Sequence, residues 1–179
     1  FEFLLKLKRI NNQIIIIELP GHNSSFFDQK NCLMMFIRRI FLFIKKNEIN
    51  NITFFTHSLG GIIPILLVKY FLKKKIKIRK FINYEGNLTE SDTETVTKRT
   101  ASYRKTEFKK KFKNLIDVCQ KSNQSHLNLW SKSLKHASSD AFYELSRDAV
   151  KYSKTNELLE FFKIFFKKKI YISGSLTKF

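Results

Sequence analysis

The chain has 179 residues and a formal net charge of +19, from 34 Lys and Arg against 15 Asp and Glu. This length suits one domain that buries about 70% of the surface of the unfolded chain, and the 43% hydrophobic and 15% aromatic content excludes general disorder. The apolar stretches are shorter than the roughly 18 residues that cross a bilayer, so we expect a soluble, cytoplasmic protein.

The first half of the chain alternates between predicted strands and predicted helices. Residues 13–19 (QIIIIEL) are a continuous β-branched run, which predicts a strand buried on both faces of a parallel sheet. Apolar residues recur at helical spacing over 28–46, and a short apolar strand is expected at 52–55. A helix at 62–72 and a strand at 76–84 complete an order that is typical of parallel α/β proteins.

The second half of the chain is predicted to be mainly helical. Ser, Thr and Glu dominate 88–100, and no β-rich run occurs before residue 168. Residues 169–173 (KIYIS) return to a strand pattern, so we interpret the intervening helices as an insertion that covers the sheet. The helical pieces are expected at about 107–121, 127–135, 139–152 and 157–166.

Ser58 stands between the apolar strand at 52–55 and the helix at 62–72. A nucleophilic serine must lie exposed on a sharp turn from strand to helix, and the residues two before and two after it must be small because the two backbones approach each other there. Gly60 meets this requirement, and Thr56 meets it in part. The backbone N–H of Leu59, at the start of the helix, is placed to stabilise an oxyanion.

Four segments resemble motifs of the α/β-hydrolase superfamily, and together they extend over most of the chain, from about 13 to 174. Residues 18–25 (ELPGHNSS) are similar to the D-L-P-G-H-G-x-S turn after that superfamily's fourth strand. Residues 57–61 (HSLGG) are similar to the G-H-S-L-G-G nucleophile elbow after its fifth strand. Residues 85–89 (EGNLT) and 171–174 (YISG) are similar to segments that close its sixth and seventh strands.

The resemblance implies a partial α/β-hydrolase core, built on a parallel sheet, with an inserted helical cap. We expect residues 1–87 to form the central part of the core with the elbow, 88–166 the cap, and 167–179 a return strand. The superfamily's first strands with the H-G loop that donates half of the oxyanion hole, and the histidine after its last strand, have no counterpart. Because histidines 22, 57, 126 and 136 do not stand where that base belongs, we interpret the chain as the middle of a hydrolase.

The resemblance also implies the roles of single residues. Ser58 would be the nucleophile, and the Leu59 N–H would belong to the oxyanion hole. Two interpretations of Glu85 stay open: it is the catalytic acid, which some members place after the sixth strand, or a structural carboxylate bonded to backbone N–H groups or to a lid lysine. The turns themselves would be shaped by Gly21, His22, Gly60 and Gly61.

Three residues depart from the superfamily's pattern. Thr56 and Asn23 replace glycines, and Glu18 keeps the acidic character of the usual aspartate. Asparagine enters the left-handed backbone region more easily than most residues, so Asn23 is tolerable there. Thr56, in contrast, is expected to crowd the elbow.

Other conspicuous side chains have packing interpretations. His57 is adjacent to the nucleophile and should point away from it, while His22 should fix its turn. Trp130 and the phenylalanines at 161, 162, 165 and 166 have helical spacing, which favours ordinary packing over an acyl-binding pocket. Neither Cys32 nor Cys119 has a partner at disulfide-framework or zinc-ligand spacing, so both are expected to be reduced.

These features predict a serine-nucleophile acyl hydrolase, of the carboxylesterase, lipase or thioesterase kind, that acts on a small-molecule ester or thioester. No glycine-rich phosphate motif and no metal-ligand cluster occurs in the sequence, so no cofactor or metal is expected. The 179 residues alone should have little activity, because a serine hydroxyl without its base is a poor nucleophile. The sequence gives no indication of the oligomeric state.

The charge supports an alternative from another class, a non-catalytic basic module that binds an anionic membrane surface or nucleic acid. Its motivation is the lysine clusters at 73–75, 109–113 and 167–169. Each cluster stands at the end of an apolar segment, where the helix dipole stabilises positively charged side chains. None of the clusters alternates with aromatic residues, as the residues of a nucleic-acid groove do. Because the abundant Lys, Ile, Phe and Asn share A/T-rich codons, we expect no specific nucleic-acid partner and at most weak peripheral membrane contact.

Overall fold

The computed structural model describes residues 13–23, 25–28, 32–72 and 76–173, so the lysines at 73–75 and Gly174 lie outside the described residues. The elements of the first half are α2 (Cys32–Lys46), β1 (Asn51–His57), the 3₁₀ turn η1 (Ser58–Gly61), α3 (Ile62–Tyr70) and β2 (Lys77–Tyr84). Those of the second half are η2 (Ser91–Thr93), α4 (Val96–Ser102), α5 (Lys105–Gln120), α6 (Ser125–Leu134), α7 (Ser139–Ser153), α8 (Glu157–Phe165) and β3 (Lys169–Ile172).

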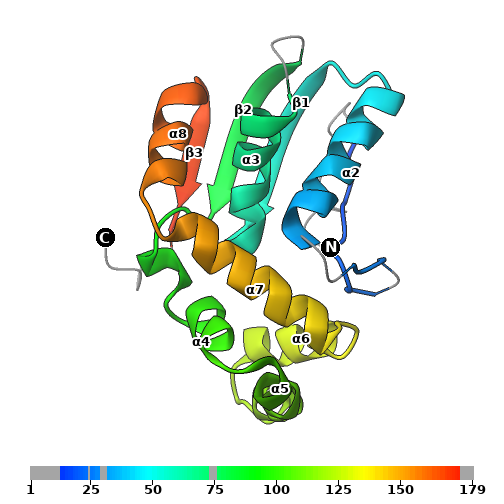
Figure 1. Cartoon of the computed structure of the whole chain (residues 1–179), viewed down its shortest axis with the longest axis vertical. Helices are drawn as coiled ribbons and strands as arrows, with labels where there is room; N and C mark the ends of the chain where they lie inside the picture. The colour runs from blue at the N-terminus through cyan, green and yellow to red at the C-terminus, as the bar shows by residue number, and fades with distance from the viewer. Residues whose placement is uncertain (1–12, 24, 29–31, 73–75, 174–179) are drawn as a thin grey trace.

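The three strands form one parallel sheet in the order β1-β2-β3. Figure 1 shows α3 and α8 lying over the sheet, α2 beside α3, and α7 running obliquely between the sheet and the helices α4, α5 and α6. This arrangement confirms the predicted α/β class with a parallel sheet. All carboxyl ends of the strands therefore meet at the edge of the sheet that faces α7, which is where parallel α/β proteins bind ligands.

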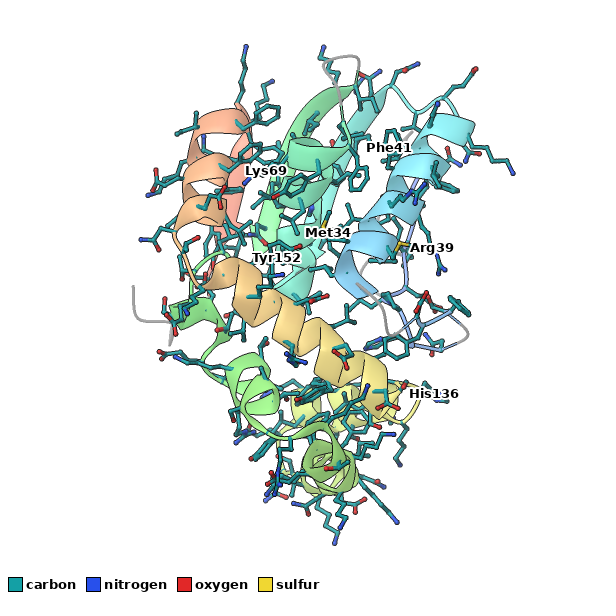
Figure 2. All side chains as sticks on the ribbon, in the orientation of Figure 1. Met34, Arg39, Phe41, Lys69, His136 and Tyr152 are labelled. Carbon is teal, nitrogen blue, oxygen red and sulfur yellow. The ribbon has the colours of Figure 1, made fainter. Side chains whose placement is uncertain are left out.

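The core lies between the sheet and the helices that cover it. Phe81 on β2 is fully buried, and its ring contacts Phe162 of α8 and Phe166 at centroid distances of 5.1 and 4.9 Å. Figure 2 shows Met34 and Phe41 of α2, both packed against this core, on the side of the helix towards α3. The register of the sheet places Phe54 opposite Phe81, so alternate residues of β1 point into the same layer.

The prediction of a strand at 13–19 is wrong. Residues 13–19 are irregular, and the isoleucines from 14 to 17 are between 42% and 50% exposed. A β-branched run forms a strand only when a neighbouring strand accepts its backbone hydrogen bonds, because β-propensity reflects packing on a paired surface. None of the strands in the described part of the chain pairs with it.

The helical second half has a hydrophobic cluster of its own. Phe108, Phe112, Leu134 and Tyr143 are buried together across α5, α6 and α7, separately from the core cluster that holds Phe81. The predicted helices at 107–121, 127–135, 139–152 and 157–166 correspond to α5 to α8 within two residues, whereas α4 was not predicted. The division of the chain at residues 88 and 167 stays a prediction. No helix in the described ranges is long and apolar enough to span a membrane.

Candidate active site

Ser58 stands directly after β1, at the carboxyl edge of the sheet, and begins the turn η1 that continues into α3. Its φ of 52° lies in the left-handed region, which costs a residue with a Cβ roughly 1–2 kcal/mol. A strained residue at the junction of a strand and a helix indicates a functional turn, because the surrounding structure must hold it there. The predicted sharp turn at Ser58 is therefore present.

Glu85 occupies the corresponding position at the end of the neighbouring strand β2. Its φ of 46° is also left-handed, and its backbone N–H donates to the Ile172 carbonyl of β3 at 2.8 Å. The backbone N–H of Asn87, two residues further on, donates to the Ser58 carbonyl at 3.1 Å. The structure thus brings together two strained non-glycine residues, Ser58 and Glu85, on adjacent strand ends.

His57 packs on the opposite side of β1 from Thr56. Its ring stacks on Tyr84 of β2, with a centroid distance of 5.2 Å. Partial burial lowers the pKa of His57, because it disfavours the charged imidazolium, and the Glu85 carboxylate acts in the opposite direction. The stacking is the packing role that the sequence indicated for His57. The effect of Glu85 on the pKa of His57 indicates that the Glu85 charge lies close to the elbow.

The loop that carries Glu85 is held by a carboxylate and a phenol. Asp92 accepts hydrogen bonds from the backbone N–H groups of Leu88 and Thr89 at 2.9 and 2.7 Å. The Tyr171 hydroxyl of β3 donates to the Gly86 carbonyl at 3.1 Å and lies 3.4 Å from Asp92 Oδ1. Burial first, and then the Asp92 charge, raises the pKa of Tyr171, so this phenol remains a hydrogen-bond donor.

The turn at 18–25 lies against the start of α7. Gly21 has a φ of 70°, and a Cβ at this position would overlap Ala141 of α7. Asn23 adopts a φ of 49°, as its type allows, and its side-chain amide donates to Glu18 at 2.6 Å. The His22 ring donates to the Pro20 carbonyl at 3.1 Å, and its role in fixing the turn stays a prediction.

The same turn is fastened to the loop between α6 and α7 by backbone hydrogen bonds. The Asn23 N–H donates to the His136 carbonyl, and the Ser138 N–H donates to the Gly21 carbonyl, both at 2.7 Å. Figure 2 shows His136 at one end of α7 and Tyr152 near the other. Therefore α7 spans the distance between this turn and the strand ends.

The expected crowding by Thr56 is not observed. A Cβ built on Gly60 would lie 3.6 Å from the Thr56 Cβ, which is an ordinary van der Waals contact. The Thr56 hydroxyl donates instead to Oδ1 of Asn83, at 3.1 Å. Asn83 is fully buried directly below the elbow and is a residue that the sequence analysis missed. The signal that would have found it is a polar residue inside the apolar strand sequence F-I-N-Y.

The remaining conspicuous side chains contribute to packing or to ion pairs. Trp130 packs against the cluster of Phe108 and its neighbours, and Cys119 is buried on α5. Lys109 forms an ion pair with Asp140 at 3.0 Å, and Lys169 donates to the Phe166 carbonyl at 2.9 Å, after the end of α8. No group of three metal-ligating side chains occurs among the described residues.

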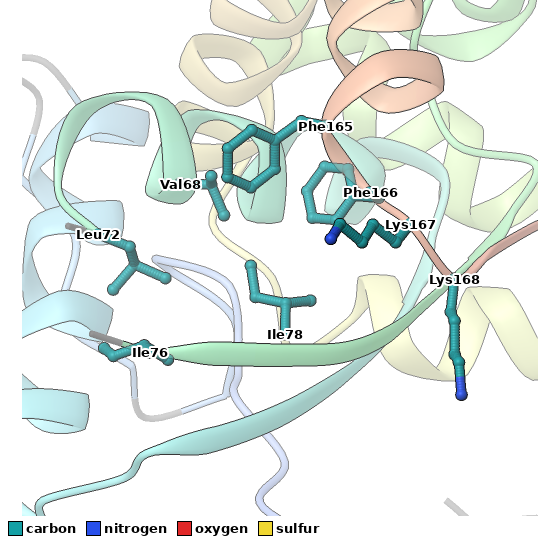
Figure 3. A pocket seen from close by; sticks show the side chains of 8 residues that line it. All are labelled: Val68, Leu72, Ile76, Ile78, Phe165, Phe166, Lys167 and Lys168. Carbon is teal, nitrogen blue, oxygen red and sulfur yellow. The ribbon is translucent and has the colours of Figure 1, made fainter. Parts of the chain in front are cut away.

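A hollow of about 420 Å³ opens at the amino end of β2, away from Ser58 (Figure 3). Ile78 on β2 and Ile76 just before it line the hollow, together with Val68 on α3 and Leu72 just after that helix. Phe165, Phe166, Lys167 and Lys168 complete the lining. Because the strands run from this end towards Ser58, the hollow is separate from the candidate active site.

Solved structures supply the comparisons for this chain; no protein-family model and no curated protein matches it. A carboxylesterase of Nitrososphaera gargenis matches with a TM-score of 0.68 at 19% identity, over 97% of this chain and 65% of that one. Staphylococcus aureus MenH matches with a TM-score of 0.60 at 14% identity, over 88% and 73% of the two chains. An Exiguobacterium antarcticum esterase matches with a TM-score of 0.55 at 14% identity, over 86% of this chain and 60% of that one.

These neighbours are all α/β-hydrolase fold proteins, so the likeness shows that fold for this chain. A lactonase, AidH, matches similarly with a TM-score of 0.56 at 12% identity. This chain spans 65%, 60% and 58% of the lengths of the carboxylesterase, the esterase and the lactonase. Each of these solved proteins therefore contains polypeptide that has no counterpart among the 179 residues.

Proposed function

Since the chain has the α/β-hydrolase fold, we propose that it is the central part of a serine acyl hydrolase, with Ser58 as its nucleophile. The observation that carries the proposal is the strained serine, at φ 52°, on a tight turn between a parallel strand and a helix. A serine held in that conformation projects its hydroxyl from the end of the sheet, which is what attack on a bound substrate requires.

The proposed reaction is acyl transfer from an ester or thioester to water. The Ser58 Oγ attacks the carbonyl carbon, its proton passes to a base, and the carbonyl oxygen becomes an oxyanion. The Leu59 N–H is the first donor after the nucleophile, and at the start of a helix it can stabilise that oxyanion. Collapse of the intermediate releases the alcohol or thiol, and water then attacks the acyl-enzyme in the same way.

We assign Glu85 as the acid that orients the base. Three observations support this: it follows the strand next to that of Ser58, it has a strained left-handed backbone, and its charge acts on His57 beside the nucleophile. The rival interpretation, a carboxylate that only fixes its own loop, is weakened because Asp92 already binds the backbone N–H groups of that loop.

We place the base outside the 179 residues. The His57 ring faces Tyr84, and the His22 ring binds the Pro20 carbonyl. His126 is exposed in the first turn of α6, and His136 lies in the loop before α7. The neighbours' additional polypeptide is the natural source of a histidine and of a second oxyanion donor.

The test compares two proteins: the 179-residue chain, and the same chain expressed with its flanking coding sequence. With p-nitrophenyl butyrate, the longer protein should hydrolyse the ester, and Ser58→Ala should lower kcat/KM by at least about 1,000-fold. Ser133→Ala, an exposed serine of α6, is the matched control and should change nothing. Retained hydrolysis in Ser58→Ala would overturn the proposal.

A fluorophosphonate probe tests the assignment of the base. The 179-residue chain should be labelled slowly at Ser58, and the longer protein rapidly. Rapid labelling of Ser58 in the 179-residue chain would show that the base lies within it, which contradicts our assignment while leaving the nucleophile in place.

A further inference from the structure

The end of β1 and the end of β2 are joined by a polar contact inside an otherwise apolar layer. Thr56 and Asn83 are opposite each other in the parallel register, two residues before Ser58 and Glu85 respectively. The Thr56 hydroxyl donates to Asn83 Oδ1 at 3.1 Å. The contact therefore lies directly behind both strained residues of the site.

The Asn83 amide also separates the two backbones that follow the strands. A Cβ on Gly61 would lie 2.6 Å from Asn83 Oδ1 and 2.8 Å from the Gly86 Cα, and a Cβ on Gly86 would overlap the same amide. Gly61 belongs to the turn after Ser58, and Gly86 follows Glu85. One planar side chain thus sets the spacing between the two loops that carry the site.

Stability alone does not account for an asparagine at this position. Asn83 is fully buried, and its Nδ2 has no hydrogen-bond partner among the described residues. An unpaired buried donor destabilises the folded state, and an apolar side chain of similar size would avoid that loss. Buried polar groups are normally hydrogen-bonded, so the unpaired Nδ2 requires an explanation. The location of Asn83 between the two loops provides that explanation.

We propose that Asn83, held by Thr56, is a positioning residue of the Ser58 site, which fixes the end of β1 against the end of β2 and so sets the backbone of Ser58 and Glu85. The proposal rests on the proposed function for its catalytic meaning. It also explains Thr56, which replaces the glycine of the resembling motif: its hydroxyl satisfies the acceptor that the buried amide presents.

The hydrogen bond from the Asn87 N–H to the Ser58 carbonyl provides a direct readout. Thr56→Val keeps the shape of the side chain and removes the hydroxyl. In this variant of the 179-residue chain, amide exchange at Asn87 should accelerate at least fivefold, while exchange at Phe81, whose N–H donates to the Lys168 carbonyl, should not change. Thr56→Ser should restore the slow exchange. Thr53→Val, on the exposed face of β1, is the matched control.

Reactivity of Ser58 provides the second readout, in the protein expressed with its flanking sequence. Thr56→Val should lower the rate of fluorophosphonate labelling at least fivefold in fully folded protein, and Thr56→Ser should restore it. In an Asn83→Ser background the Thr56→Val change should have no further effect, since the coupling is already lost.

The outcomes separate the two proposals. Unchanged exchange at Asn87 in Thr56→Val would overturn the positioning role, and so would equal acceleration at Asn87 and Phe81, which would indicate general destabilisation. The exchange pattern could be as expected while no variant is labelled by the fluorophosphonate at Ser58. That result would contradict the assignment of Ser58 as the nucleophile and leave the contact between Thr56 and Asn83 established.

Discussion

Ser58 and Glu85 both adopt the left-handed backbone conformation, which glycine adopts at little cost. Ser58 and Glu85 have φ values of 52° and 46° at adjacent strand ends. The strain at each is of the order of 1–2 kcal/mol, and a fold selected only for stability would use glycine there. Backbone strain at both positions therefore supports a chemical role for both side chains.

The left-handed strain at Ser58 predicts that Ser58→Gly stabilises the chain. Glycine relieves the left-handed strain, so the free energy of unfolding should rise by up to about 1 kcal/mol, measured by urea denaturation. The control is Ser133→Gly in the exposed face of α6, which should lower the free energy of unfolding by about 0.5 kcal/mol because glycine is a poor helix former. Equal destabilisation by the two changes would contradict the presence of strain at Ser58.

At the scale of elements, α8 is attached to the sheet by its aromatic residues. Phe162 is buried against Phe81, whereas Phe165 of the same helix is 51% exposed. Phe162→Ala should lower the free energy of unfolding by about 3–5 kcal/mol, because it leaves a cavity between α8 and β2. Phe165→Ala is the matched control and should cost less than about 1 kcal/mol. Comparable losses in urea unfolding would show that α8 is not held through Phe162.

The sequence predicted those elements whose stability is local or whose partners follow closely in the chain. The helices α5 to α8 lie in the stretch before residue 168 that lacks a β-rich run, and β1 and β2 follow from apolar runs beside the turn at Ser58. The run at 13–19 failed because its β-branched residues specify a strand only beside a partner strand. The short helix α4 (VTKRTAS) has no apolar stripe to reveal it.

The candidate site was predictable only in part. Ser58 and Glu85 follow from motifs, because the end of a strand has a sequence signature. The contact between Thr56 and Asn83 joins residues 27 positions apart, and its geometry depends on the register of two strands. No local pattern encodes that register, so the sequence indicated only that Thr56 was unusual, and its expected crowding was wrong.

At the scale of the whole molecule, the charge of +19 is the main electrostatic feature. Several of its lysines are paired, such as Lys105 with Glu144 at 2.9 Å and Lys98 with Glu90 at 2.9 Å. Because only 15 acidic residues are present, most of the positive charge has no acidic partner and repels itself in the folded state.

Salt should therefore stabilise the chain. Raising NaCl from about 0.05 M to 0.5 M shortens the Debye length from roughly 14 Å to 4 Å, which screens this repulsion, so the midpoint of urea unfolding should increase. In parallel, any binding to duplex DNA or anionic vesicles should disappear near 0.2 M salt. Binding that survives 0.2 M salt with a defined site size would support the basic-module alternative.

The helix α7 joins the turn that holds Gly21 to the loop after Glu85, since the Ser138 N–H before it donates to the Gly21 carbonyl at 2.7 Å and the Ser153 hydroxyl at its end donates to the Asn87 carbonyl at 2.8 Å. Both ends of α7 are thus tied to other segments by hydrogen bonds. The aromatic cluster across α5, α6 and α7 is separate from the core cluster that holds Phe81. We therefore expect substitutions within that cluster to leave the backbone of Ser58 unchanged.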